Sequence, residues 1–174
     1  MPEAPGVRYE LVNGAPVKVA GTGVQYNLLV NRVSELLRTF VRKRGLGLVL
    51  TDGAGHVIRR NPDRVIISDV SFVAWDGLPS RRATEGYCPV PPDIAIDVAS
   101  PNDRQEDVHG KVQEYLDAGS RLVIALWPTS RSVTVYTPGV VAQELGADDY
   151  GDFGDALPPF RAKVADIFDV QLEG

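Results

Sequence analysis

The sequence predicts a single α/β domain in which short strands and two main helices share 174 residues. Three observations favour this class. Asn13-Gly14 separates two β-type runs and is typical of a two-residue hairpin. Apolar residues recur at helical spacing between Val24 and Val41. A strand, a helix and a strand follow one another between Ile94 and Trp127, which is the order of a parallel crossover unit.

The N-terminal third is expected to form the hairpin and one long helix. The hairpin strands are Arg8 to Val12 and Pro16 to Ala20. The helix follows a cap at Thr22-Gly23, and its apolar stripe comprises Val24, Leu28, Leu29, Val33, Leu36, Leu37, Phe40 and Val41. Arg42-Lys43-Arg44-Gly45 then supplies the cations and the glycine that favour a helix end.

The remaining elements are strands, loops and two further helices. Three β-type runs are Leu46 to Thr51, His56 to Arg60 and Val65 to Trp75, the last with a bend at Ser68-Asp69, and a long surface loop covers Gly77 to Pro92. The crossover unit comprises a strand from Ile94 to Ala99, a helix that starts after Ser100 to Asp103 and runs to about Ala118, and a strand from Arg121 to Trp127. A hairpin of Ser132 to Thr137 and Val140 to Leu145 and a short helix from Ala162 to Phe168 complete the domain.

Composition excludes several classes of protein. With 44% hydrophobic residues the chain can fill one core, and no run approaches the roughly 18 apolar residues of a membrane-spanning helix. The single Cys88 cannot form an internal disulfide, and with His56 and His109 it cannot build a Cys/His zinc cage. Because the N-terminus also lacks a signal pattern, we expect a cytoplasmic protein without a membrane partner.

The net charge of −5 is unevenly distributed along the chain. Residues 1–139 carry 16 Lys and Arg against 15 Asp and Glu, whereas residues 140–174 carry 2 against 8. The body is therefore close to neutral. Its local basic groups, at 38–44, 59–64 and 81–82, could contact phosphates, although solvated surface is the more common role of such groups. The acidic stretch from Asp148 to Asp155 has the same default role.

Two acidic residues interrupt apolar strands. The chain has no Gly-x-Ser-x-Gly elbow, phosphate loop or complete dinucleotide motif, which disfavours serine hydrolysis and hydride transfer. Asp69 precedes an apolar run, and Asp97 lies within Ile94 to Ser100. Because side chains alternate along a strand, Asp97 shares a face with Ala95 and Ala99. A buried carboxylate at this place requires a metal, a cation or hydrogen-bond donors.

Lys111 is unusual for its place on a helix. It falls with Val112 and Tyr115 on the stripe that should face the sheet, so it could reach the face that carries Asp97. The spacing leaves two alternatives open, a solvent-exposed pair with Asp107 and a side chain that snorkels to the surface.

An inward Lys111 next to Asp69 and Asp97 would suit a hydrolytic metal site. Carboxylates hold hard divalent cations such as magnesium, and the lysine would orient a water molecule or stabilise developing charge. The same three side chains could also bind a phosphate-bearing ligand without cleaving it.

Several short segments occur in an order that is more specific than any one of them. They are Tyr9 to Gly14, Ser68 to Val73, Pro92 to Arg104, Lys111 to Tyr115 with Gly119, Val133 to Tyr136, and Leu157 to Phe160 followed by Ile167-Phe168. In these segments, which extend over almost the whole chain, the sequence resembles the Uma-two family of restriction endonuclease-like proteins, within the PD-(D/E)XK nuclease superfamily.

The resemblance implies a restriction endonuclease-like fold, with a mixed central β-sheet flanked by helices. It also implies an endonuclease that hydrolyses DNA phosphodiester bonds with Mg²⁺ or Mn²⁺ and forms a homodimer. Asp69 and Asp97 would be the metal carboxylates. Lys111 would replace the superfamily lysine, whose usual position two residues after the second acid is here Ala99. Glu10 matches an early acidic residue that would complete the metal shell, and its alternative role is that of a surface glutamate on the hairpin.

Three positions depart from the family pattern. Ser68 stands where proline is usual, Asp97 where glutamate is usual, and Val24-Gln25 where a histidine is frequent. These departures concern activity more than fold. The alternative hypothesis is therefore a catalytically inactive binding or assembly module that keeps the nuclease fold.

Overall fold

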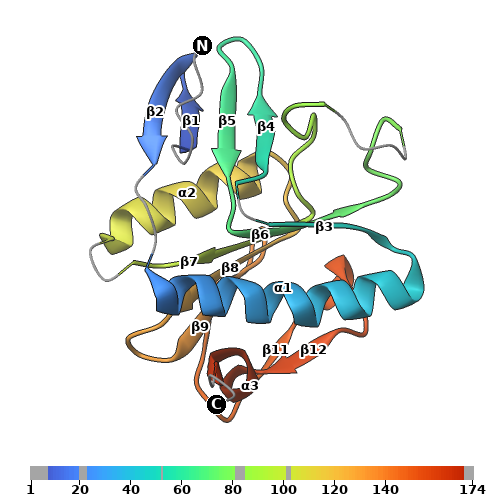
Figure 1. Ribbon diagram of the computed structural model, residues 1–174, viewed down its shortest axis with the longest axis vertical. Helices are drawn as coiled ribbons and strands as arrows, with labels where there is room; N and C mark the ends of the chain where they lie inside the picture. The colour runs from blue at the N-terminus through green and yellow to red at the C-terminus, as the bar shows by residue number, and fades with distance from the viewer. Residues whose placement is uncertain (1–7, 20–22, 52, 81–84, 101–102, 171–174) are drawn as a thin grey trace.

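The computed structural model describes residues 8–19, 23–51, 53–80, 85–100 and 103–170 (Figure 1). Within these ranges, a six-stranded and a four-stranded sheet are joined by the chain and accompanied by two long helices. Some of the predicted features include residues outside the described ranges, namely Ala20, Thr22, Arg81-Arg82 and Pro101-Asn102.

The four-stranded sheet has the order β2-β1-β5-β4 and is antiparallel. Its strands are β1 (Arg8–Val12), β2 (Ala15–Val19), β4 (Gly55–Arg59) and β5 (Arg64–Ile67). Asn13 and Gly14 have φ angles of 51° and 79°, which confirms the predicted hairpin turn. Since Leu11 pairs with Val65, the hairpin lies beside the strand that leads into Asp69.

The six-stranded sheet has the order β10-β9-β8-β7-β6-β3. Its strands are β3 (Gly47–Thr51), β6 (Val70–Ala74), β7 (Ile94–Val98), β8 (Leu122–Trp127), β9 (Ser132–Tyr136) and β10 (Gln143–Leu145). β7 and β8 pair in parallel, and the crossover between them contains α2 (Gln105–Asp117). The other described neighbours in this sheet pair antiparallel. The sheet is therefore mixed, as expected.

The predicted run from Val65 to Trp75 forms two strands in two different sheets. Its first half, β5, belongs to the four-stranded sheet, and its second half, β6, belongs to the six-stranded sheet. The break falls at Ser68-Asp69, where the sequence predicts a bend. Asp69 therefore lies at the junction of the two sheets.

The two helices cover opposite faces of the six-stranded sheet. α1 (Val24–Arg44) buries Leu29, Val30, Val33, Leu37 and Val41, and it ends at Gly45 with a φ of 63°, as the glycine predicted. In β7, Ile94, Ile96 and Val98 contribute to the core under α1, whereas Ala95 packs with Val112 and Tyr115 of α2. The alternation of the strand thus directs Asp97 to the α2 face.

The C-terminal part differs from the expectation in three places. β10 starts at Gln143 rather than at Val140, because Val140 and Val141 are 66% and 91% exposed and pair with no strand. β11 (Tyr150–Asp152) and β12 (Arg161–Lys163) form a small sheet that the sequence analysis missed, since three-residue strands leave little alternation to detect. Between them is a 3₁₀ turn (Gly154–Ala156), and α3 (Val164–Phe168) begins two residues later than expected because Ala162 belongs to β12.

The expected surface loop is not exposed throughout. Within it, Cys88 is buried and forms an isolated bridge with the buried His56 of β4. No helix in the described part of the chain has the length and apolarity needed to cross a membrane.

Candidate functional site

The carboxylates of Asp69 and Asp97 accept hydrogen bonds from each other's segment of backbone, at the point where β6 pairs with β7. The Asp69 amide donates to Asp97 Oδ1 at 3.2 Å, and the Val98 amide donates to Asp69 Oδ2 at 2.7 Å. The register explains this contact, because Val70 lies opposite Ile96 and Asp69 continues the pairing towards Asp97. Two carboxylates therefore lie next to each other in a partly buried place, with 16% of the Asp97 side chain exposed.

Lys111 points from α2 into this place. Its Nζ lies 3.0 Å from Asp97 Oδ2 and donates to the Ile67 carbonyl oxygen at 2.8 Å. Of the three orientations that the spacing left open, the structure therefore selects the inward one over a pair with Asp107. The side chain as a whole remains 30% exposed, while its ammonium group lies buried next to Asp97.

Neighbouring charges change the affinity of both Asp69 and Lys111 for protons. Burial and the neighbouring charge of Asp97 raise the pKa of Asp69 to about 6, although Lys111 and the Tyr26 hydroxyl act in the opposite direction. Burial alone would lower the pKa of Lys111, but Asp97, Asp69 and Glu10 together raise it above its ordinary value. Lys111 is therefore a cation at neutral pH, and its positive charge does not fully offset the repulsion between the two aspartates.

Tyr26 belongs to the site and was missed by the sequence analysis. It lies in the first turn of α1, and its hydroxyl donates a hydrogen bond to Asp69 Oδ1. Its spacing to Leu29, Val30 and Val33 is that of a core residue, and Tyr26 indeed packs partly buried against the core. The available signal was the polar end of a tyrosine at the start of a helix that covers the sheet.

Glu10 is held inside the structure rather than on the hairpin surface. Its Oε1 accepts from the Ile67 amide at 3.3 Å, and 19% of its side chain is exposed. The peptide units of Ile67 thus connect Glu10, through the amide, with Lys111, through the carbonyl. The alternative of a surface glutamate is wrong, while its place in a metal shell stays a prediction.

Arg64 is the second residue that the sequence analysis missed, since it was grouped with the basic residues at 59–64. It is 9% exposed, and it binds Glu114 through Nε at 2.5 Å and Nη2 at 3.0 Å. Its Nη1 lies 3.5 Å from Glu10 Oε2 and donates to the carbonyls of Leu11 and Val65 at 3.2 Å each. Arg64 therefore connects β1, β5 and α2 and is not available to phosphates.

Two buried hydroxyl groups flank the site. Ser68 Oγ and Tyr115 Oη are buried next to each other and meet no further hydrogen-bond partner among the described residues. Burial raises the pKa of Tyr115 well above its ordinary value, so its phenol stays neutral. Ala99, at the usual position of the superfamily lysine, is buried and leaves Lys111 as the cation next to Asp97.

The donor set is compatible with a hard divalent cation. No group of three or more His, Cys, Asp or Glu side chains in the described ranges could hold a metal ion. Asp69 and Asp97 nevertheless offer carboxylate oxygens, and burial together with their mutual repulsion raises the pKa of Asp69. Mg²⁺ is commonly held by one or two carboxylates, with water and substrate phosphates as its other ligands. Two carboxylates at a partly exposed place fit that pattern.

Comparison with known proteins decides the family. The family model described as "Putative restriction endonuclease" matches residues 1–164. The chain belongs to this family, Uma-two. Its fold is also similar to the crystal structure of a "putative nuclease belonging to DUF820" from Anabaena variabilis, with a TM-score of 0.81 and 16% sequence identity over 98% of this chain and 94% of that chain. No curated protein sequence matches.

The Uma-two assignment confirms the family and the restriction endonuclease-like fold that the sequence predicted. At 16% identity, the structural likeness bears on the fold alone.

Proposed function

We propose that this Uma-two protein is a metal-dependent endonuclease that hydrolyses phosphodiester bonds of DNA. The observation that carries the proposal is the contact of Asp69 with Asp97 at the junction of the two sheets, with Lys111 Nζ 3.0 Å from Asp97. A pair of carboxylates with one cation has the composition of a hydrolytic metal site. The nuclease family and fold agree with this composition.

In this proposal each residue has a separate role. Asp69 and Asp97 hold Mg²⁺ or Mn²⁺, which supplies the positive charge that polarises the phosphodiester and favours deprotonation of water. Lys111 keeps its proton because its pKa is raised, so it acts by stabilising negative charge that develops on the phosphate. Tyr26 orients Asp69 through its hydrogen bond, and Glu10 supports Lys111 through the Ile67 peptide units.

The test is cleavage of supercoiled plasmid and single-stranded DNA with Mg²⁺, Mn²⁺ or a chelator. We expect metal-dependent nicking by the wild type and its loss in Asp97→Asn and in Lys111→Ala. Asp97→Asn keeps a carbonyl acceptor for the Asp69 amide, so it removes charge with little change in shape. Glu106→Ala is the matched control, because Glu106 is an exposed acid in the first turn of α2.

Cleavage that persists in both Asp97→Asn and Asp69→Asn would refute the proposal. If a folded wild type cleaves neither substrate, the alternative of an inactive binding or assembly module takes its place. Thermal unfolding of each variant separates a lost site from a lost fold.

Three further expectations belong to this proposal. We propose that residues 1–174 form one folding domain, which predicts a single cooperative unfolding transition. We propose a homodimer, because duplex cleavage requires a site for each strand, and sedimentation should give twice the mass of the chain. We also propose a cytoplasmic location, which cell fractionation would test.

A further inference from the structure

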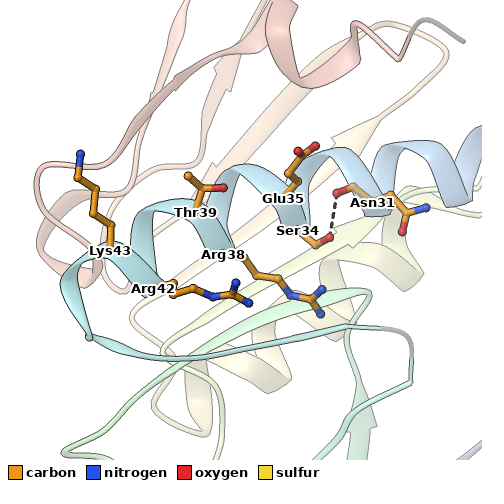
Figure 2. Close-up of a pocket in the computed structure, with 7 residues that line it drawn as sticks. All are labelled: Asn31, Ser34, Glu35, Arg38, Thr39, Arg42 and Lys43. Carbon is orange, nitrogen blue, oxygen red and sulfur yellow. Dashed lines mark hydrogen bonds between the residues drawn. The ribbon is translucent and has the colours of Figure 1, made fainter. Parts of the chain in front are cut away.

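The exposed side of α1 carries a concentration of positive charge that the proposed site does not use. The helix contains five Lys and Arg residues and one acidic residue, on a chain whose total charge is −5. Its outer surface borders a hollow of about 640 Å³ (Figure 2). Arg38, Arg42 and Lys43 line the hollow together with Asn31, Thr39 and Glu35, and all six are exposed.

Helix stability does not account for all of these cations. Arg42, Lys43 and Arg44 occupy the last turn, where the helix dipole favours positive charge, and Arg44 also lies 3.9 Å from the centre of the Phe40 ring. Arg38 lies a full turn earlier. Its Nη2 donates to Thr51 Oγ1 of β3 at 2.9 Å, which fixes the guanidinium at the edge of the helix.

The basic side chains that line the hollow form no ion pairs with described residues of the protein. Among the described residues, no carboxylate lies within ion-pair distance of Arg38, Arg42 or Lys43. Figure 2 shows the guanidinium groups of Arg38 and Arg42 on one side of α1, whereas Glu35 extends from the other side. The two guanidinium groups therefore point away from Glu35, although Glu35 lines the same hollow and lies three residues before Arg38.

The length of the hollow along α1 favours an extended polyanion over a single phosphate. Asn31 and Lys43 are twelve residues apart, which corresponds to about 18 Å along a helix axis. One strand of duplex DNA carries a phosphate about every 3.4 Å of its axis, so several phosphates would fit this length. Arg38 and Arg42 lie about 6 Å apart along the axis, and arginine binds phosphate oxygens with two parallel hydrogen bonds.

The same helix reaches the proposed site. Tyr26, in its first turn, binds Asp69, so the cations lie about 18 to 24 Å further along one rigid element. We propose that the Arg38 and Arg42 side of α1 binds the phosphodiester backbone of the nucleic acid that flanks the cleaved bond. This inference rests on the proposed function, because it takes the nuclease substrate as the ligand.

The test measures binding without cleavage. A fluorescent 20-base-pair DNA duplex is titrated in chelator at several salt concentrations between about 50 and 200 mM, a range over which phosphate contacts are strongly screened. For the double variant Arg38→Gln/Arg42→Gln we expect at least about tenfold weaker binding at the lowest salt. The slope of log affinity against log salt should decrease by about 2, one unit for each lost phosphate contact.

The controls separate a local contact from a change in net charge. Arg131→Gln/Arg161→Gln removes two exposed cations outside α1 and should leave the slope unchanged. Arg38→Lys/Arg42→Lys should keep the slope, since it keeps both charges. Thermal unfolding confirms that each variant is folded.

The outcomes are distinct from those of the cleavage test. An unchanged slope in Arg38→Gln/Arg42→Gln refutes the inference even if the wild type cleaves DNA. A reduced slope with a wild type that never cleaves supports the surface and refutes the nuclease. If the wild type binds no DNA and Arg38→Gln/Arg42→Gln loses self-association in sedimentation, this side of α1 binds a second copy of the chain. That result would also refute the inference.

Discussion

Replacement of Arg64 tests whether the contacts around the proposed site are as tightly built as the structure indicates. The 9% exposed guanidinium binds Glu114, Glu10 and the carbonyls of Leu11 and Val65. In Arg64→Ala, Glu10, which is 19% exposed in the wild type, would lose its ion-pair partner, and the two carbonyls would lose a donor. Glu114 is 41% exposed and would be hydrated instead.

The expected loss of stability follows from this burial. Removing one partner of a buried ion pair costs about 3–5 kcal/mol, and the exposure of Glu114 places Arg64→Ala at about 3 kcal/mol. With a urea m-value of about 2–3 kcal/mol/M, the unfolding midpoint should fall by about 1–1.5 M at an unchanged slope. Equilibrium urea unfolding followed by circular dichroism measures this shift.

Two control variants make the result interpretable. Glu114→Gln removes the more exposed partner and should cost about 1 kcal/mol or less. Arg60→Ala removes an exposed arginine, 3.3 Å from Asp63, and should change stability by about 0.5 kcal/mol at most. A loss below about 1 kcal/mol for Arg64→Ala, or an equal loss for Glu114→Gln, would refute the argument that Arg64 is the buried centre of this network.

Three other predictions concern separate parts of the molecule. Tyr26→Phe removes the hydroxyl that donates to Asp69, so cleavage should slow about tenfold while duplex binding in chelator stays the same; equal cleavage rates would exclude Tyr26 as a positioning residue. Burial lowers the pKa of His56 below 6.5, and its ring nitrogens contact the Val90 carbonyl and Ser71 Oγ. The unfolded state therefore binds a proton on His56 more readily than the folded state does. The stabilisation that neutral His56 contributes is lost as pH falls below about 6.5. The difference in unfolding free energy between wild type and His56→Gln should therefore shrink from about pH 7 to about pH 5. A difference in unfolding free energy that stays constant over this pH range would contradict the lowered pKa of His56. Gly47→Ala should destabilise the protein by about 2 kcal/mol or more, because the added Cβ would clash with the Val73 carbonyl oxygen. Gly110→Ala lies on an exposed part of α2, where an added Cβ meets nothing within 4 Å, and should stabilise the protein by about 0.5–1 kcal/mol. If urea unfolding gave the same sign for both variants, one of these two environments would be wrong.

The sequence predicted those features whose causes are local. The turn at Asn13-Gly14 follows from the backbone freedom of two residues, and α1 follows from one apolar stripe and a glycine end. The alternation of β7 is equally local, and that alternation alone assigns Asp97 to the face opposite the isoleucines. The family resemblance indicated which acidic residues belong to the candidate site, and the match over residues 1–164 confirms that family.

Only the tertiary structure decided how residues distant in sequence contact one another. Periodicity left Lys111 with three orientations, and the charge of Asp97 on the neighbouring β7 strand selects the inward one. Tyr26 meets Asp69 across 43 positions, and Arg64 meets Glu114 across 50. Such contacts depend on strand order and on the division of the run at Ser68-Asp69 between two sheets, and neither leaves a periodic signal. The sequence by itself therefore determined the elements and the family, whereas packing between the elements determined which polar side chains form the site, because a buried charge is stable only where another element supplies its partner.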